Sequence, residues 1–263
     1  MPYETPPWTQ VVAHRGNSGP MPENTTIAIN SAIDLGVDMV EIDIRLTKDD
    51  VPILLHNDRL DGTTSGTGRV TDLTWDELKT LDAGSWRGRQ FADEPVRALD
   101  EVLNLTRGRV ALNLDIQVPE AAQPTVIAAI AAGVSAGVVI SGCTAKCVQT
   151  VGDMTSSVAT LFNPDELLVG IDPAKAHTVA RQSIDIAAEL GTMGINIPHQ
   201  LVDIGLVEQA RDAEIGVWTF VVDDEARFSN LMDMGVTSIT TNWPERMLPL
   251  VKEGFSRPGR IRS

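Results

Sequence analysis

Short, β-branched apolar runs alternate with amphipathic segments along almost the whole chain, and this alternation limits the possible folds more than any other feature. Strands that alternate with helices form parallel sheets, because each helix carries the chain back to the same edge. Eight such units in 263 residues favour a closed parallel (β/α)8 TIM barrel over an open doubly wound sheet, since these barrels have about 250 residues. The predicted strands are 11–16, 39–47, 110–116, 137–142, 156–162, 192–198, 217–223 and 238–242.

The segments between these runs carry helix start and stop signals. Asn24 or Thr25 is a suitable N-cap for the first helix. Glycine readily adopts the left-handed conformation of a C-cap, and four glycines stand where helices should end. These are Gly36, Gly191, Gly216 and Gly235. The predicted helices are 25–36, 98–106, 122–133, 174–190, 203–214 and 225–234.

Residues 48–97 interrupt the alternation, because they are too long for a single link between two units. We expect 39–56 to form a long second strand followed by a returning strand, and 57–97 to form a small insertion over the barrel mouth. About 40 residues bury too little apolar surface to fold alone. We therefore expect one domain over 1–263, with a loosely ordered basic tail at 254–263.

The charge of the chain excludes several classes of partner. The formal net charge is -15, which repels nucleic acid and anionic membranes. No run approaches the roughly 18 apolar residues of a membrane span, and the first ten residues lack the features of a signal peptide. We therefore expect a cytoplasmic protein that binds neither nucleic acid nor, by stable insertion, a membrane.

The chain has only two cysteines, Cys143 and Cys147. No further thiol or histidine accompanies them, so they do not form a zinc site. We expect both to pack on or near one helix face, without a disulfide framework.

Carboxylates at the ends of strands indicate a metal site. Glu41 and Asp43 alternate along the second predicted strand, so both point to the same face. Asp115 ends the third strand, and chemistry in such barrels lies where strands end. Buried carboxylates are costly to desolvate unless a cation lies between them, and oxygen ligands favour Mg²⁺ or Ca²⁺. The alternative is an ion pair from these carboxylates to Arg15 or Arg45.

Two histidines bracket this acidic strand. His14 precedes Arg15 and Gly16 at the end of the first strand, and His56 lies at a strand tip. Imidazoles with a pKa near neutral can share proton transfer, one as acid and one as base. The planar guanidinium of Arg15 suits phosphate oxygens, and Gly16 allows close approach of the backbone. The combination is typical of metal-assisted chemistry on a phosphoryl group.

The order and spacing of these residues resemble those of the glycerophosphodiester phosphodiesterases. The resemblance rests on HRG at 14–16, PENT at 22–25, ExD at 41–43 and His56, and it extends from about residue 11 to about residue 248. LDAGSW at 81–86, NLD at 113–115 and VWT at 217–219 agree with it. The resemblance implies a TIM barrel that hydrolyses a small phosphodiester, such as a glycerophosphodiester, to an alcohol and a phosphomonoester such as glycerol 3-phosphate.

The resemblance also implies roles for individual residues. His14 and His56 correspond to the general acid–base pair and Arg15 to the phosphate clamp. Glu23, in the PENT turn, would orient His14 or Arg15 or contact the site directly. Trp218, on the seventh strand, either lines the pocket mouth against the alcohol portion of the substrate or packs in the core.

The metal site implied by the resemblance has one change. Glu41 and Asp43 correspond to ligands of a divalent cation, Mg²⁺ or Ca²⁺, and Asp115 completes the set where the family usually has glutamate. Phe162 and Asn163, which end the fifth strand, are weaker candidates for the pocket wall.

Four further positions depart from the family pattern. Gln117 replaces a lysine, Asn57 an aspartate, Gly62 an arginine and Asn242 an aspartate. The loss of the lysine removes a fixed positive charge beside the phosphate. We therefore expect the preferred alcohol group or the rate to differ from the family norm.

Two other functions are weighed against hydrolysis. A relative of lysophospholipase D or sphingomyelinase D would close a cyclic phosphate on a lipid head group, but the sequence shows no apolar surface for a lipid. A non-catalytic phosphodiester-binding barrel is suggested by the missing lysine. Retention of both histidines, the arginine and three carboxylates argues against it.

Overall fold

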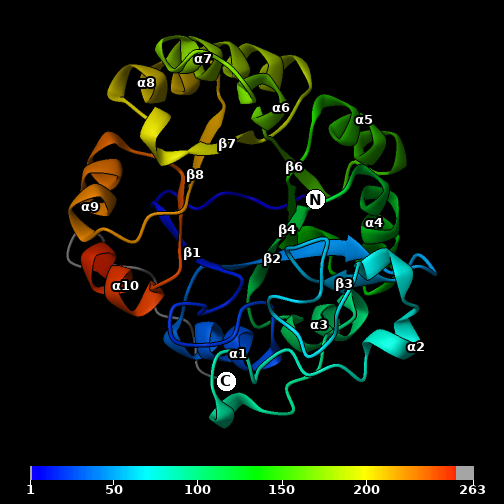
Figure 1. Cartoon of the computed structure of the whole chain (residues 1–263). Coiled ribbons are helices and arrows are strands. Elements are labelled where there is room, and N and C mark those ends of the chain that lie inside the picture. Colours follow the sequence, from blue (N-terminus) through cyan, green and yellow to red (C-terminus); the bar gives the residue numbers. More distant parts are fainter. Residues whose placement is uncertain (1, 253–263) are drawn as a thin grey trace.

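Eight parallel strands close into a barrel in this computed structural model, which describes residues 2–252 (Figure 1). The barrel strands are β1 (Gln10–His14), β2 (Met39–Leu46), β4 (Ala111–Ile116), β5 (Val138–Ser141), β6 (Ala159–Phe162), β7 (Gly194–Pro198), β8 (Gly216–Phe220) and β9 (Ser238–Thr241). Their order is β1-β9-β8-β7-β6-β5-β4-β2, and a parallel pairing of β1 with β2 closes the ring. The predicted TIM-barrel class is confirmed.

Helices surround the barrel on its outside (Figure 1). They are α1 (Thr26–Leu35), α3 (Leu99–Thr106), α4 (Ala122–Ala131), α5 (Ala145–Met154), α6 (Asp165–Leu168), α7 (Pro173–Glu189), α8 (Ile204–Asp212), α9 (Glu225–Met234) and α10 (Pro244–Lys252). The main core lies between them and the strands. Thr25 caps α1 and Gly36 ends it, as predicted. The predicted helix end at Gly216 is wrong, because α8 stops at Asp212 and Gly216 begins β8.

A second, smaller core lies inside the barrel. Its members alternate with outward-facing residues along the strands, as the pleat requires. They are Val12, Met39, Val139, Ala159, Leu161 and Trp218, and Tyr3 packs against them. His14 and Glu41 each lie two residues beyond a member of this core, toward the carboxyl end of the strand. The core therefore supports the polar residues at the mouth.

The insertion after β2 begins with the predicted returning strand. This strand, β3 (Pro52–Leu54), is antiparallel to β2. The segment 57–97 that follows contains α2 (Trp75–Leu78) and a small core of its own. Arg87 in this segment donates a hydrogen bond to the carbonyl of Gly19, which ties the insertion to the loop between β1 and α1.

Cys143 and Cys147 lie at the start of α5, where both were expected near one helix. The expectation that they form no disulfide is wrong, because their sulfur atoms are bonded and their Cα atoms lie 5.0 Å apart. Cys143 precedes the N-cap Thr144 and Cys147 lies in the first turn, so the helix itself brings them together.

Two further predictions concern membrane spans and the C-terminal tail. Within residues 2–252, no helix has the length and apolar character needed to cross a membrane. The predicted tail at 254–263 lies outside the described residues.

Candidate functional site

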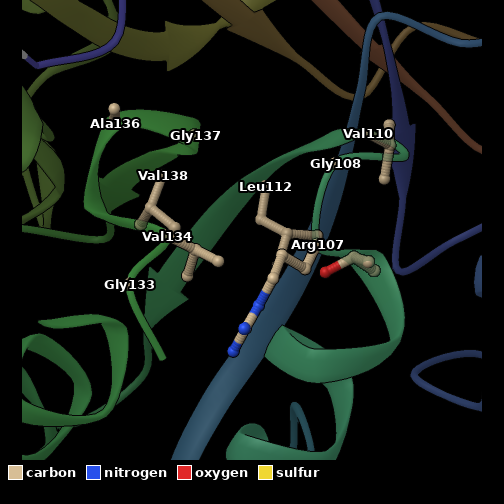
Figure 2. Close-up of a pocket in the computed structure, with 10 residues that line it drawn as sticks. Arg107, Gly108, Val110, Leu112, Gly133, Val134, Ala136, Gly137 and Val138 are labelled. Carbon is tan, nitrogen blue, oxygen red and sulfur yellow. The ribbon is translucent and has the colours of Figure 1, made fainter. Parts of the chain in front are cut away.

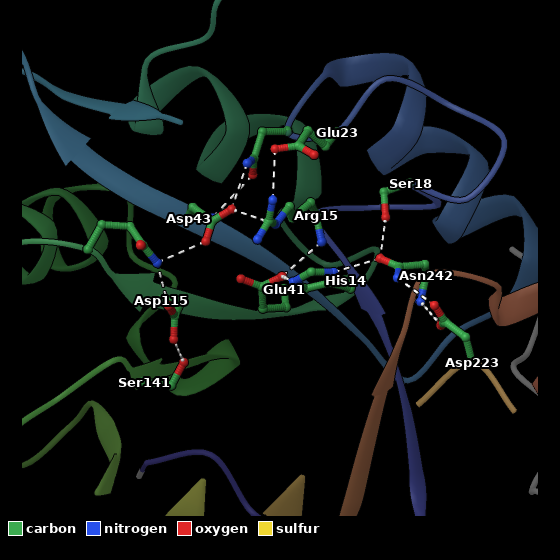
Figure 3. A network of polar contacts seen from close by, with 12 residues as sticks. His14, Arg15, Ser18, Glu23, Glu41, Asp43, Asp115, Ser141, Asp223 and Asn242 are labelled. Carbon is green, nitrogen blue, oxygen red and sulfur yellow. Dashed lines mark hydrogen bonds and ion pairs between the residues drawn. The ribbon is translucent and has the colours of Figure 1, made fainter. Parts of the chain in front are cut away.

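A pocket of about 380 Å³ opens where the barrel strands end. Six of the side chains predicted from the sequence line it: His14, Arg15, Glu41, Asp43, His56 and Asp115. They come from β1, from β2, from β4 and from the loop that follows β3. These elements are neighbours at one side of the barrel. Figure 3 shows five of them converging on one network of polar contacts.

Three carboxylates in the pocket have the geometry of a cation site. One oxygen from each of Glu41, Asp43 and Asp115 lies within 4.8 Å of the others. Asp43 and Asp115 are register partners on β2 and β4. Burial and the neighbouring Asp43 carboxylate raise the pKa of Glu41 well above its ordinary value, and the same two causes raise the pKa of Asp115 to about 7. Three crowded carboxylates, two buried and one half-buried, fit a divalent cation with oxygen ligands.

Amide and hydroxyl groups hold these carboxylates in place. Gln117 Nε2 donates to Asp43 Oδ1 at 2.9 Å and to Asp115 Oδ2 at 2.5 Å. Ser141 Oγ donates to Asp115 Oδ1 at 2.6 Å, and Asn24 Nδ2 donates to Asp43 Oδ2 at 2.8 Å. The ligand set therefore has the supporting hydrogen bonds that fix the orientation of metal ligands.

Arg15 is held by acidic side chains on two sides. Its Nη1 donates to Glu23 Oε1 at 2.8 Å, and its Nε lies 3.0 Å from Asp43 Oδ2. Its backbone N–H donates to Glu41 Oε2 at 2.8 Å from a left-handed conformation with φ of 54°. Glu23 does not line the pocket, so it acts on the site through Arg15. The adjacent Gly16 has φ of 81°, and an added Cβ would lie 2.6 Å from the backbone of Ala28.

The proton of His14 is located by its neighbours. Asn242 Nδ2 lies 2.7 Å from Asp223 Oδ2, and a carboxylate can only accept, so the amide nitrogen faces Asp223. Asn242 Oδ1 therefore faces His14 Nδ1, at 2.7 Å, and also accepts from Ser18 Oγ. An amide oxygen cannot donate, so Nδ1 carries the proton (Figure 3). The lone pair of neutral His14 is on Nε2.

The charge state of His14 follows from its surroundings. Burial and the Arg15 guanidinium lower its pKa below 6.5, more than the Asn242 hydrogen bond and the nearby carboxylates raise it. His14 is therefore neutral at pH 7. Its Nε2 lies 4.0 Å from Glu41 Oε2, which places the lone pair beside the carboxylate cluster. This is the state that a general base requires.

His56 lines the pocket from the loop after β3. Its Nδ1 is 3.0 Å from Asn57 Oδ1. Arg45 Nε donates to the His56 carbonyl at 2.6 Å, which anchors the loop to β2. Asn57 thus contacts the histidine from the position where the resembled family has aspartate.

Trp218 does not reach the pocket. Its side chain is 1% exposed and belongs to the core inside the barrel. The prediction that Trp218 lines the pocket mouth and contacts substrate is therefore wrong, and the alternative of core packing holds. Phe220, two residues further along the same face of β8, lines the pocket instead. Trp218 thus lies on the face of β8 that leads to the pocket, but too far from the end of the strand to reach it.

Several other pocket residues were not predicted from the sequence. Asp165, Asn196, Phe220, Val221 and Thr240 line the pocket but match no short motif. Position along the chain is their only signal: Phe220 ends β8, Val221 and Asp165 follow barrel strands, and Asn196 and Thr240 lie within β7 and β9. Asn163, a weaker candidate from the sequence, also lines the pocket.

A second cavity, of about 180 Å³, lies near the opposite ends of β4 and β5 (Figure 2). Arg107 is the only charged residue among its lining side chains, and glycine, alanine and valine make up most of the rest. It contains no acid–base pair and no metal-binding group, so it is not the reactive site.

The chain matches known proteins over most of its length. Residues 14–246 match the model of the Glycerophosphoryl diester phosphodiesterase family. A Bacillus subtilis glycerophosphodiester phosphodiesterase is 27% identical over 262 residues, covering 93% of this chain and 86% of that protein. A glycerophosphodiester phosphodiesterase of Caldanaerobacter subterraneus is 46% identical over 97 residues, or 37% of this chain. In two of the curated relatives the aligned segment makes up only 44% and 40% of the relative's length.

The fold also matches a solved enzyme complex. An Oleispira antarctica phosphodiesterase, solved with its product sn-glycerol-3-phosphate, has 25% sequence identity and a TM-score of 0.79. The match covers 93% of this chain and 97% of that one.

Proposed function

The chain belongs to the glycerophosphoryl diester phosphodiesterase family, and we propose that it hydrolyses glycerophosphodiesters to an alcohol and glycerol 3-phosphate. The observation that carries the proposal is the single pocket that holds two histidines, an arginine and three clustered carboxylates. The Oleispira antarctica phosphodiesterase solved with sn-glycerol-3-phosphate matches 93% of this chain, which supports the same product.

The first step uses the glycerol hydroxyl beside the phosphate. The phosphate lies against Arg15, and the neighbouring hydroxyl of the glycerol attacks phosphorus. His14 Nε2 takes the proton of that hydroxyl, since its lone pair is free and its pKa is lowered. The P–O bond to the alcohol breaks, and His56 gives a proton to the departing oxygen. The products are the free alcohol and a cyclic glycerol phosphate.

The second step opens the ring with water. His56, now neutral, takes a proton from the attacking water, and His14 returns its proton to the ring oxygen as the P–O bond to it breaks. The result is a phosphomonoester, and both histidines regain their starting protonation. Arg15 is held by Glu23 and Asp43 throughout, so its guanidinium needs no rearrangement.

Glu41, Asp43 and Asp115 would hold a divalent cation, Mg²⁺ or Ca²⁺, because the donors are all carboxylate oxygens. When bound, such an ion polarises the phosphoryl oxygens and offsets the charge that develops on them. It would also add positive charge beside Arg15, in a chain whose net charge is -15. We place the enzyme in the cytoplasm, with a small phosphodiester and neither nucleic acid nor a membrane as its partner.

The test is turnover of defined diesters. Glycerophosphocholine, glycerophosphoethanolamine and a bis-aryl phosphodiester are incubated with Mg²⁺ or Ca²⁺, and again with chelator. We expect glycerol 3-phosphate from the first two with metal, and none after chelation or in His14→Ala. A cyclic phosphate as the final product would indicate a lyase. Absence of turnover with either metal, alongside retained phosphodiester binding, would indicate a non-catalytic binding barrel.

A further inference from the structure

Two opposite arcs of strands line the pocket. The first arc consists of β1, β2 and β4, and the second of β6, β7 and β8. In the ring of eight strands, β1 lies four strands from β6, β2 four from β7, and β4 four from β8. The two arcs therefore face each other across the mouth. The first arc carries the reactive residues. The second arc contributes Asn163, Asp165, Asn196, Phe220 and Val221.

The second arc contains a single charged side chain, Asp165. It is the first residue of α6 and is exposed at the pocket wall. Asn163 Nδ2 lies 3.4 Å from its Oδ2, and no lysine, arginine or histidine within residues 2–252 forms an ion pair with it. It also lies outside the group of three carboxylates that could hold a cation. Burial raises the pKa of Asp165 above its ordinary value, and its charge in turn raises the pKa of Asp115. Because no cationic side chain pairs with Asp165, a cationic group of a ligand can do so.

The neighbours of Asp165 in this arc are neutral. Asn163 and Asn196 are 5% and 7% exposed and present carboxamides, while Phe220 presents an aromatic ring and Val221 an apolar surface. A carboxylate with an aromatic ring attracts an organic ammonium group, through charge and through the electron-rich ring face. The same carboxylate repels an anionic group.

We propose that a phosphodiester held at the first arc extends its alcohol group toward the second, where Asp165, with Phe220, selects alcohols that carry an ammonium group, such as choline and ethanolamine. The inference rests on the proposed function, because it assigns a substrate class to the same pocket. Asp165 is a specificity residue here and takes no part in proton transfer.

The experiment compares two diesters that differ in the charge of the alcohol. The kcat/KM values for glycerophosphocholine and for the uncharged alcohol ester glycerophosphoglycerol are measured in the metal-loaded wild type, Asp165→Asn and Asp165→Glu. Glu166→Gln is the matched control, since Glu166 is the next residue of α6, is exposed and does not line the pocket.

We expect Asp165→Asn to lower kcat/KM for glycerophosphocholine about tenfold, mainly through KM, because one attraction between opposite charges is lost. The value for glycerophosphoglycerol should change less than about twofold, as expected for a group with no charge to lose. Asp165→Glu should retain the preference, and Glu166→Gln should match wild type. The loss in Asp165→Asn should shrink at high salt.

Three results would overturn the inference while leaving the proposed function in place. These are an equal loss on both diesters, no change on either, or a wild type that hydrolyses only glycerophosphoglycerol. A wild type that hydrolyses neither diester overturns the proposed function and the inference with it.

Discussion

The side-chain amide of Gln117 donates to Asp115 Oδ2 across 2.5 Å, and the same nitrogen lies 2.9 Å from Asp43 Oδ1. Where the family usually has a lysine, a neutral group bridges two of the three clustered carboxylates. The bridge orients the carboxylates but adds no positive charge. In the proposed mechanism, Arg15 and a cation at the carboxylate cluster would then have to offset the charge on the phosphate.

Gln117→Lys should raise kcat/KM for glycerophosphodiesters about tenfold. An ammonium beside the phosphate adds a charge-assisted interaction in the transition state. The measurement is steady-state kinetics with saturating metal. Gln117→Met is the control, because it keeps the side-chain length and removes both hydrogen bonds without adding charge. A slower Gln117→Lys would mean that the pocket has adapted to a substrate for which the charge is harmful.

The acid limb of the pH profile should lie below pH 6.5. Burial and the Arg15 guanidinium lower the pKa of His14 below 6.5, and His14 is an unprotonated base at any pH above its pKa. Activity should therefore persist as the pH falls through 6.5 and be lost only at lower pH. The check is kcat/KM against pH, together with an NMR titration of the His14 ring assigned with His14→Asn. An NMR-derived pKa for His14 at or above 6.5 would contradict the assignment of His14 as the base.

Asp223→Asn should lower kcat about tenfold with little change in KM. Asp223 accepts from Asn242 and so keeps the amide oxygen toward His14. An asparagine at 223 lets the Asn242 amide reverse, which removes the restraint that keeps the His14 proton on Nδ1. Asp224→Asn is the adjacent control, since Asp224 caps α9 on the surface. An effect on KM alone would place Asp223 in substrate binding.

Chelation should lower the melting temperature, and more so at alkaline pH. A ligand present at 100 times its Kd stabilises the folded state by about 2.7 kcal/mol. Without metal, the pKa of Asp115 is raised from its ordinary value of 3.8 to about 7 in the folded protein. This difference makes a contribution to the free energy of unfolding that is fully present below pH 3.8 and is lost as the pH rises through 7. Thermal unfolding at pH 5 and pH 8, with Mg²⁺, Ca²⁺ or chelator, measures both effects.

The control for chelation is Asp115→Asn. It should lose most of the stabilisation by metal and also part of the pH dependence of the metal-free protein. An equal response of this variant and the wild type to Mg²⁺ and Ca²⁺ would show that the ion binds elsewhere.

The fold and the local motifs could be predicted from sequence because their signals are short-range. The alternation of strands and helices defines the barrel, and the spacing of Glu41 and Asp43 places both on one face. No short-range signal indicates how near a side chain lies to the end of its strand. Trp218 and Phe220 share a face of β8, but only the barrel's closed geometry decides that one is core and the other pocket wall.

Contacts across the barrel also could not be predicted from the sequence. The asparagine at 242 was noted as a lost charge, whereas in the structure it links His14 to Asp223. Likewise, the loss of lysine at 117 was visible, but the bridge that glutamine makes between Asp43 and Asp115 was not. Both depend on side-chain rotamers that only packing selects.

The bond between His14 and Asn242 joins residues 228 positions apart, at the seam where β1 meets β9. Closing a contact so distant in sequence carries a loop-closure cost, so we expect it to form after the pairing of β2 with β4. The three carboxylates lie on β2 and β4, and their supporting groups, Arg15, Asn24, Gln117 and Ser141, all precede β6 in the chain. We therefore expect a chain that lacks the last strand to bring the carboxylates together while His14 has no partner, and so to bind a cation without turning over substrate.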